Sequence, residues 1–281
     1  MEMKEEGMES VEASMSAVRH VLLSPHLDDA VLSCGASIAQ QRAGGESVEV
    51  LTIFAGHPRL DLLSPYAVKL HEAAGNPPDM VGTRRGENEA ACRVLGAKPV
   101  CLDYLDAPYR TDPANGAFLY TSDEQLMGGH LHPADVFLVD ELAAVIAQRY
   151  QRSASALFYA PLAAGGHVDH LIVRVAALKL EQRGFPVCFY EDYPYAEQGH
   201  ALVSALARPG RRGWMAELRL VQEPHVTLKC EAIACYRSQI PVLFGDAEAM
   251  VRRVRAHMIL VGGGARYAEQ FWRSCPSHNL V

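Results

Sequence analysis

Apolar positions along the chain follow two spacings, one typical of strands and one typical of helices. Short apolar or β-branched runs bounded by Pro or Gly predict strands, and apolar residues three or four positions apart predict helices. The predicted strands are residues 20–23, 48–54, 100–102, 156–160, 186–190 and 218–221. The predicted helices are residues 30–42, 87–95, 134–150, a stretch after residue 169 that ends near 181, then 229–239 and 246–257.

Strands that alternate with helices indicate a parallel sheet with right-handed crossover connections. We therefore expect an α/β fold with a Rossmann-like, mostly parallel sheet and helices on both of its faces. From about residue 208 the alternation weakens, and this part is expected to pack as a C-terminal cap. Two long connections, 56–83 and 103–133, are expected to wall a crevice at the carboxyl ends of the strands, where such sheets bind ligands.

Composition places the chain among ordinary globular proteins, with 49% hydrophobic and 21% charged residues. Residues 1–18 contain five Glu and one Lys and are expected to form a mobile tail, which leaves residues 19–281 as a single domain. A net charge of −7 argues against nucleic acid as a partner, and no apolar run is long enough to predict a membrane span. The seven cysteines are scattered without a C-x-x-C pair, which favours reduced thiols and a cytoplasmic location.

The turn after the first predicted strand carries three groups that suit metal chemistry. It reads Ser-Pro-His-Leu-Asp-Asp and places His26, Asp28 and Asp29 at the expected crevice. A catalytic zinc site takes three protein ligands from imidazole nitrogens or carboxylate oxygens. His26 and Asp29 are predicted to supply two, which leaves Asp28 free to accept a proton from the attacking water. The simpler alternative is that Asp29 only caps the following helix.

A second motif follows the strand at 156–160 and reads Gly-Gly-His-Val-Asp-His. His167 and His170 are three residues apart, so the start of a helix would place both on one face. One of them can be the third ligand while the other contacts the substrate or the oxyanion, and Asp169 can fix an imidazole tautomer from behind. His130 and His132 are a rival pair of ligands, but no carboxylate pair accompanies them and a loop role is favoured.

The two motifs resemble the P-H-x-D-D and H-x-D-H motifs of the PIG-L, or LmbE-like, family of zinc-dependent N-deacetylases. The resemblance implies that His26, Asp29 and His170 bind zinc and that Asp28 is the general base. It also implies that His167 steadies the tetrahedral intermediate or protonates the leaving amine. The family has Pro and Glu where this chain has Leu27 and Ala30, and neither change removes a ligand.

Weaker similarity extends over residues 19–272. Arg84-Arg85-Gly86-Glu87 is similar to the family's R-x-x-E helix, which makes Arg84 the candidate substrate contact, although Arg85 is an alternative. The alternative is that Arg84 has only a structural role and forms a surface ion pair with Glu87. Asp106 resembles an acidic residue of the family's crevice.

Together these features predict a zinc-dependent hydrolase that removes an acetyl group from an N-acetylated sugar or glycoconjugate of the N-acetylglucosamine type. Fe²⁺ could replace Zn²⁺ with the same ligands. Two alternatives remain: an amidase that acts on a thiol conjugate or secondary metabolite, and a sugar- or nucleotide-binding module without turnover. No G-x-G-x-x-G follows the first strand, so a nucleotide cradle is not supported. The sequence leaves open whether the protein is a homo-oligomer.

Overall fold

The computed structural model describes residues 19–151, 156–208 and 213–275. The predicted tail at residues 1–18 lies outside this range. No helix in the described part combines the length and apolar character needed to cross a membrane. All seven cysteines lie in the described part, and all are free thiols.

One seven-stranded sheet forms the centre of the molecule, in the order β3-β2-β1-β4-β5-β7-β6. The first five strands in this order are parallel, whereas β7 is antiparallel to both β5 and β6. The strands are β1 (Arg19–Ser24), β2 (Ser47–Thr52), β3 (Lys98–Cys101), β4 (Ala156–Pro161), β5 (Val187–Tyr190), β6 (Trp214–Val221) and β7 (Tyr267–Ser274). The mixed α/β fold with a mostly parallel sheet is thus confirmed.

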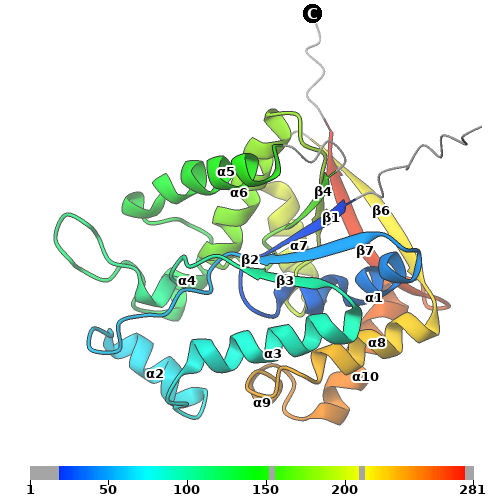
Figure 1. The fold of residues 1–281 in the computed structure, drawn as a ribbon, viewed down its shortest axis with the longest axis horizontal. Coiled ribbons are helices and arrows are strands. Elements are labelled where there is room, and N and C mark those ends of the chain that lie inside the picture. Colours follow the sequence, from blue (N-terminus) through cyan, green and yellow to red (C-terminus); the bar gives the residue numbers. More distant parts are fainter. Residues whose placement is uncertain (1–18, 152–155, 209–212, 276–281) are drawn as a thin grey trace, which may run out of the picture.

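Helices cover both faces of this sheet (Figure 1). Side chains of α1, α3, α8 and α10 form the core on one face, and those of α5, α6 and α7 form the core on the other. The helices are α1 (Asp29–Ala43), α2 (Pro65–Ala73), α3 (Met80–Leu95), α4 (Asp123–Met127), α5 (Phe137–Tyr150), α6 (Val168–Gln182), α7 (Gly199–Ala207), α8 (Glu223–Ile233), α9 (Ile240–Leu243) and α10 (Ala247–Val261). The central strands are buried on both faces, which explains their continuous apolar runs.

The C-terminal part differs in two ways from the sequence prediction. It contributes β6 and β7 to the sheet itself, besides helices that cover one face, so it is more than a cap. The helix predicted at 229–239 is wrong in its bounds, because α8 begins at Glu223 with Pro224 in its first turn and ends at Ile233. Proline favours this position because its fixed φ suits the first turn and its missing N–H is not needed there.

The two long connections also contain helices that the sequence prediction lacked. Connection 56–83 includes α2 and the first turn of α3, which begins at Met80 and not at Glu87. Connection 103–133 includes α4 and a short 3-10 turn at Ala107–Tyr109. Both connections line the main pocket, as expected.

The order of the strands determines where that pocket lies. The chain runs from β1 outward to β2 and β3 on one side, and from β4 outward to β5 on the other. The carboxyl ends of β1 and β4 therefore meet at the point where the direction of winding reverses, which is the usual ligand site of such sheets. The two histidine motifs follow these two strands directly.

Candidate active site

The turn after β1 folds back so that Asp29 faces His26. The Asp29 Oδ2 atom accepts a hydrogen bond from the His26 backbone N–H at 2.7 Å and lies 3.1 Å from His26 Nδ1. Asp29 is the first residue of α1 and not its cap, and the residue at the cap position, Asp28, makes no side-chain capping bond. The interpretation of Asp29 as a simple helix cap is therefore wrong.

The loop after β4 brings the second motif to the same point. Gly165 and Gly166 have φ of 85° and 79°. A Cβ added to Gly165 would lie 2.7 Å from the Tyr195 ring, and a Cβ added to Gly166 would lie 2.8 Å from the Met127 carbonyl oxygen. Only glycine fits this close approach. The loop leads into α6, where His167 is the N-cap residue and its Nδ1 accepts a hydrogen bond from the Asp169 backbone N–H.

His170, in the first turn of α6, completes a group of three potential metal ligands with His26 and Asp29. One ligand atom from each lies within 4.8 Å of the others, and all three residues are buried. His170 Nδ1 donates to Asp192 Oδ1 at 2.6 Å, so its Nε2 is the nitrogen that points toward Asp29 Oδ2, 3.4 Å away. That Nε2 is buried, and none of the described residues forms a hydrogen bond with it. A buried orphan nitrogen beside a carboxylate and a second imidazole fits a divalent cation.

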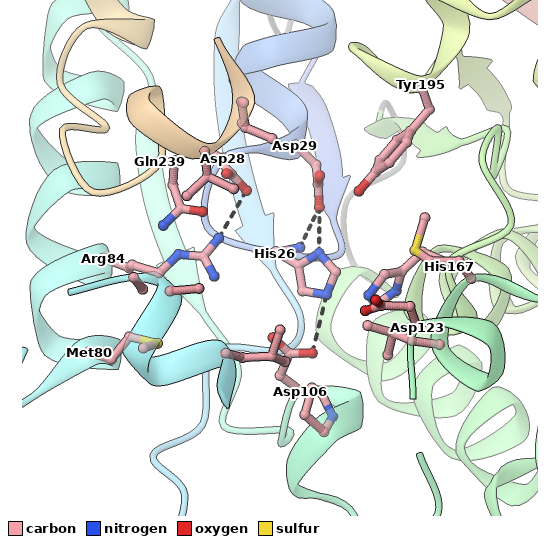
Figure 2. Close-up of a pocket in the computed structure, with 18 of the residues that line it drawn as sticks. His26, Asp28, Asp29, Met80, Arg84, Asp106, Asp123, His167, Tyr195 and Gln239 are labelled. Carbon is pink, nitrogen blue, oxygen red and sulfur yellow. Dashed lines mark hydrogen bonds and ion pairs between the residues drawn. The ribbon is translucent and has the colours of Figure 1, made fainter. Parts of the chain in front are cut away.

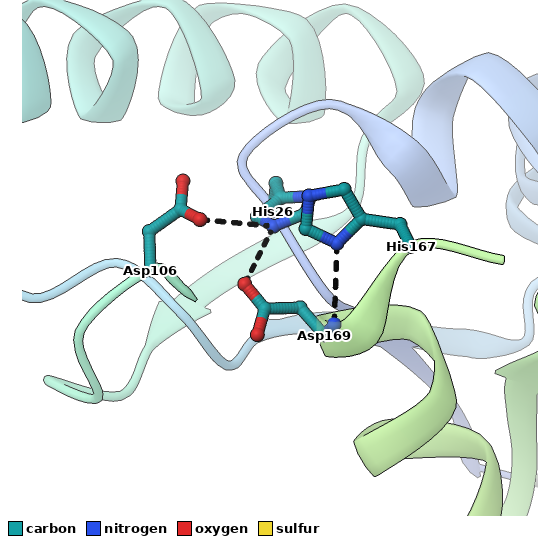
Figure 3. A group of neighbouring side chains, drawn as sticks. All are labelled: His26, Asp106, His167 and Asp169. Atoms are coloured by element: carbon teal, nitrogen blue, oxygen red, sulfur yellow. Dashed lines mark hydrogen bonds and ion pairs between the residues drawn. The ribbon is translucent and has the colours of Figure 1, made fainter. Parts of the chain in front are cut away.

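A second, overlapping group consists of His26, Asp106, His167 and Asp169 (Figure 3). Here two of the potential ligands already have partners. Asp169 Oδ2 accepts from His26 Nε2 at 3.1 Å and from the Ala107 backbone N–H, and His167 Nδ1 accepts from the Asp169 N–H. Asp106 Oδ1 lies 3.6 Å from His26 Nε2. This group therefore fits a hydrogen-bonded support behind His26 better than a second metal site.

Asp28 points away from the three potential ligands and faces Arg84. Arg84 Nη2 lies 3.2 Å from Asp28 Oδ1, and both side chains line the pocket (Figure 2). Burial raises the pKa of Asp28, with Arg84 opposing this shift. Arg85, the alternative substrate contact, instead donates to the Ala55 carbonyl outside the pocket lining. Glu87 accepts from Ser238, so the ion pair considered for Arg84 and Glu87 is replaced by other contacts.

The electrostatic environment of the site favours a positive charge between the carboxylates. Burial disfavours a charged His170, but Asp29 and Asp192 outweigh it and raise the pKa of His170 to about 9. Burial, reinforced by His26, instead holds the pKa of His167 well below its usual value. His167 is therefore neutral and, because its Nδ1 accepts a hydrogen bond, carries its proton on Nε2.

The pocket at this site has a volume of about 320 Å³ and is lined by the metal-competent residues and both long connections. Asp106, His167 and Arg84 all face it. His130 and His132 line a separate hollow, and neither belongs to a group of potential metal ligands in the described part of the chain.

Comparison with known proteins agrees with this geometry. Residues 21–180, more than half of the chain, match the PIG-L family, described as GlcNAc-PI de-N-acetylase. The chain belongs to the PIG-L family. It is accordingly an enzyme of the deacetylase, or amidohydrolase, class.

Relatives of this PIG-L protein are named as deacetylases. The 2'-N-acetylparomamine deacetylase of Niallia circulans is 28% identical over 266 residues, which is 90% of this chain and 89% of that protein. A zinc-inhibited form of teicoplanin deacetylase is 30% identical with a TM-score of 0.80, covering 92% of this chain and 100% of that one. The A40926 pseudoaglycone deacetylase is 30% identical with a TM-score of 0.74, covering 93% and 98%.

Two residues around this PIG-L site received no role from the sequence. Asp192, which follows β5, accepts from His170 Nδ1 and from the Ala164 backbone N–H. Arg110 lies behind the site and forms an ion pair with Asp169 at 2.6 Å. A signal existed for Asp192, because it follows a predicted parallel strand in the same way as the two histidine motifs. Arg110 lies inside a long connection and carries no such signal.

Proposed function

We propose that this protein is a metal-dependent hydrolase that removes the acetyl group from an N-acetylated sugar or glycoconjugate of the N-acetylglucosamine type and releases acetate. The observation that carries the proposal is the meeting of His26, Asp29 and His170 beside Asp28 in one pocket. A metal site next to a carboxylate that is not one of its ligands suits amide hydrolysis. The names of its relatives, which are deacetylases of acetylparomamine and teicoplanin, support a sugar-type substrate.

Zn²⁺ is the proposed metal, held by His26 Nδ1, Asp29 and His170 Nε2. Two imidazoles and one carboxylate suit this borderline-soft cation, and Fe²⁺ is the alternative with the same ligands. When bound, the cation would polarise the amide carbonyl and lower the pKa of an adjacent water. Asp169 supports the site from behind, because its carboxylate accepts the His26 Nε2–H and so leaves His26 Nδ1 free to bind the metal.

The other residues supply proton transfer and hydrogen bonds. Asp28 accepts the proton of the attacking water as the general base, and Arg84 holds its carboxylate in the pocket. The neutral His167 directs its Nε2–H toward the oxyanion that develops on the amide. The leaving amine takes its proton from Asp28 or His167. We also assign the contacts with the sugar to Arg84 and Asp106, and their position in the pocket lining beside this centre supports this assignment.

Acetate release from a panel of N-acetylated sugars tests the proposal. The panel comprises methyl N-acetylglucosaminide, N-acetylparomamine and an N-acetylated thiol conjugate. One equivalent of Zn²⁺ is used, because a similar enzyme has been solved in a zinc-inhibited form. We expect acetate from the sugars and its loss in His170→Ala, while the matched variant of an exposed histidine outside the pocket, His130→Ala, stays active. Release only from the thiol conjugate, or from no compound, would reject the proposed function.

A further inference from the structure

The main pocket has an apolar side that the proposed chemistry does not use. Three helices contribute to it, and we call it the apolar wall: Leu70 and Ala73 of α2 with the C-cap residue Ala74, Met80 of α3, and Val242 and Leu243 of α9. Met80 lies on the same side of the pocket as Arg84, across from His167 and Tyr195 (Figure 2). The wall is therefore continuous with the reactive centre.

Core packing does not account for this wall. Leu70 and Leu243 contact the hydrophobic core with one part of the side chain and face the pocket with another. Val242 is 63% exposed. Met80 also lines a neighbouring hollow of about 170 Å³ together with Leu60, which is 60% exposed. A row of aliphatic side chains that remains open to solvent beside a polar centre is typical of a binding surface.

The charges in the pocket do not select for a polycationic substrate. Four carboxylates line it, namely Asp28, Asp29, Asp106 and Asp123. Arg84 and a bound divalent cation would offset three of these four negative charges. Asp123 is also engaged by the Tyr66 hydroxyl, which donates to it at 2.6 Å. Little negative charge remains to attract additional ammonium groups, whereas the side chains of the apolar wall stay partly or fully open to solvent in the described part of the chain.

We infer that the apolar wall binds an alkyl or aryl group attached to the acetylated sugar, so that the preferred substrate is an N-acetylated amino sugar with an apolar aglycone. This inference rests on the proposed function for the identity of the sugar. The sugar would lie between Arg84, Asp106 and the metal ligands, and its aglycone would extend along α2 and α9.

The first test is equilibrium binding of glycosides that lack the acetyl group and are not turned over. The affinities of methyl and hexyl glucosaminide are compared by calorimetry with the zinc-loaded protein. Each methylene that becomes buried should tighten binding by about fourfold, so we expect the hexyl compound to bind at least tenfold more tightly. Equal affinities for the two glycosides would overturn the inference, even if acetate release is normal.

The second test locates the effect on the wall with two matched variants. Val242→Asp places a charge on the wall, and Val203→Asp places one on α7 outside the pocket at a similar exposure, 66% against 63%. We expect the tenfold preference for the hexyl glycoside to collapse in Val242→Asp and to persist in Val203→Asp. Equal preference in both variants would show that the aglycone binds elsewhere and would overturn the inference. Preferential hexyl binding without acetate release from any sugar would reject the proposed function and leave the apolar subsite standing.

Discussion

The buried guanidinium of Arg110 allows a quantitative test of how the candidate metal site is supported. Arg110 lies between two buried carboxylates, 2.7 Å from Asp135 Oδ2 and 2.6 Å from Asp169 Oδ1. Its guanidinium also packs over the rings of Phe54 and Tyr120. The Asp169 side chain is 0% exposed, and its other oxygen accepts from His26 Nε2. Arg110 thus acts on the proposed ligand His26 through a single carboxylate.

Replacement of Arg110 by Met keeps the apolar packing and removes the charge. Burial alone would raise the pKa of Asp169, and Arg110 is foremost among the groups that hold it well below its usual value. Without Arg110, two carboxylates remain buried and uncompensated, which costs about 3–5 kcal/mol of the free energy of unfolding. Because Asp169 orients His26, we also expect metal affinity to fall by roughly 10–100-fold.

Urea unfolding and competitive zinc titration measure the two effects separately. The control is Arg59→Met, which removes an exposed ion pair with Asp61 and should leave both quantities unchanged. Arg110→Lys keeps the charge but not the planar fork, so it should fall between the wild type and Arg110→Met. If Arg110→Met does not fold, Arg110→Lys still reports on metal affinity. An Arg110→Met protein with wild-type stability and zinc affinity would refute the reasoning.

Three further predictions follow from the site and its surroundings. Asp28→Ala should keep its zinc and lose roughly 10²–10⁴-fold in turnover, whereas Asp29→Ala should lose the metal; elemental analysis and acetate release separate these outcomes. Asp192→Asn should weaken zinc binding by roughly 10–100-fold, because the carboxylate that accepts from His170 Nδ1 loses its charge; an unchanged titration would contradict this role. Burial and the nearby Lys229 lower the pKa of His257 to about 4, so a protonated His257 favours the unfolded chain. Stability should therefore decline as the pH falls from about 6.5 toward 4, and His257→Gln should flatten this slope in thermal unfolding; an identical slope would exclude the effect.

The parallel half of the fold could be predicted because its signals are local. The apolar runs of β1, β2, β4 and β5 are bounded by turn residues and alternate with amphipathic helices. The sequence pattern does not predict β7, because its burial does not follow a period of two and its pairing with β5 and β6 depends on residues far away in the sequence. The displaced α8 has a similar cause. Lys229 of α8 is buried, and its Nζ lies 2.8 Å from Glu269 of β7 and donates to the Ser33 carbonyl at 3.2 Å, both far away in the sequence.

The site shows the same division between local and long-range information. The positions of His26, Asp29, His167 and His170 after two neighbouring strands could be inferred from the motifs alone. The partners of these residues could not be inferred in the same way, because Arg84 approaches Asp28 across 56 residues of chain. One sequence carries no signal for such pairs, and only the folded structure brings them together.

The central claim is that one divalent cation, held by His26, Asp29 and His170, is required for removal of the acetyl group. The most direct measurement is acetate release from methyl N-acetylglucosaminide while zinc is titrated into chelator-treated protein. We expect no release without metal, a linear rise to a maximum at one equivalent, and no rise in His170→Ala. Full activity in protein shown by elemental analysis to contain no metal, or equal recovery in His170→Ala, would contradict it.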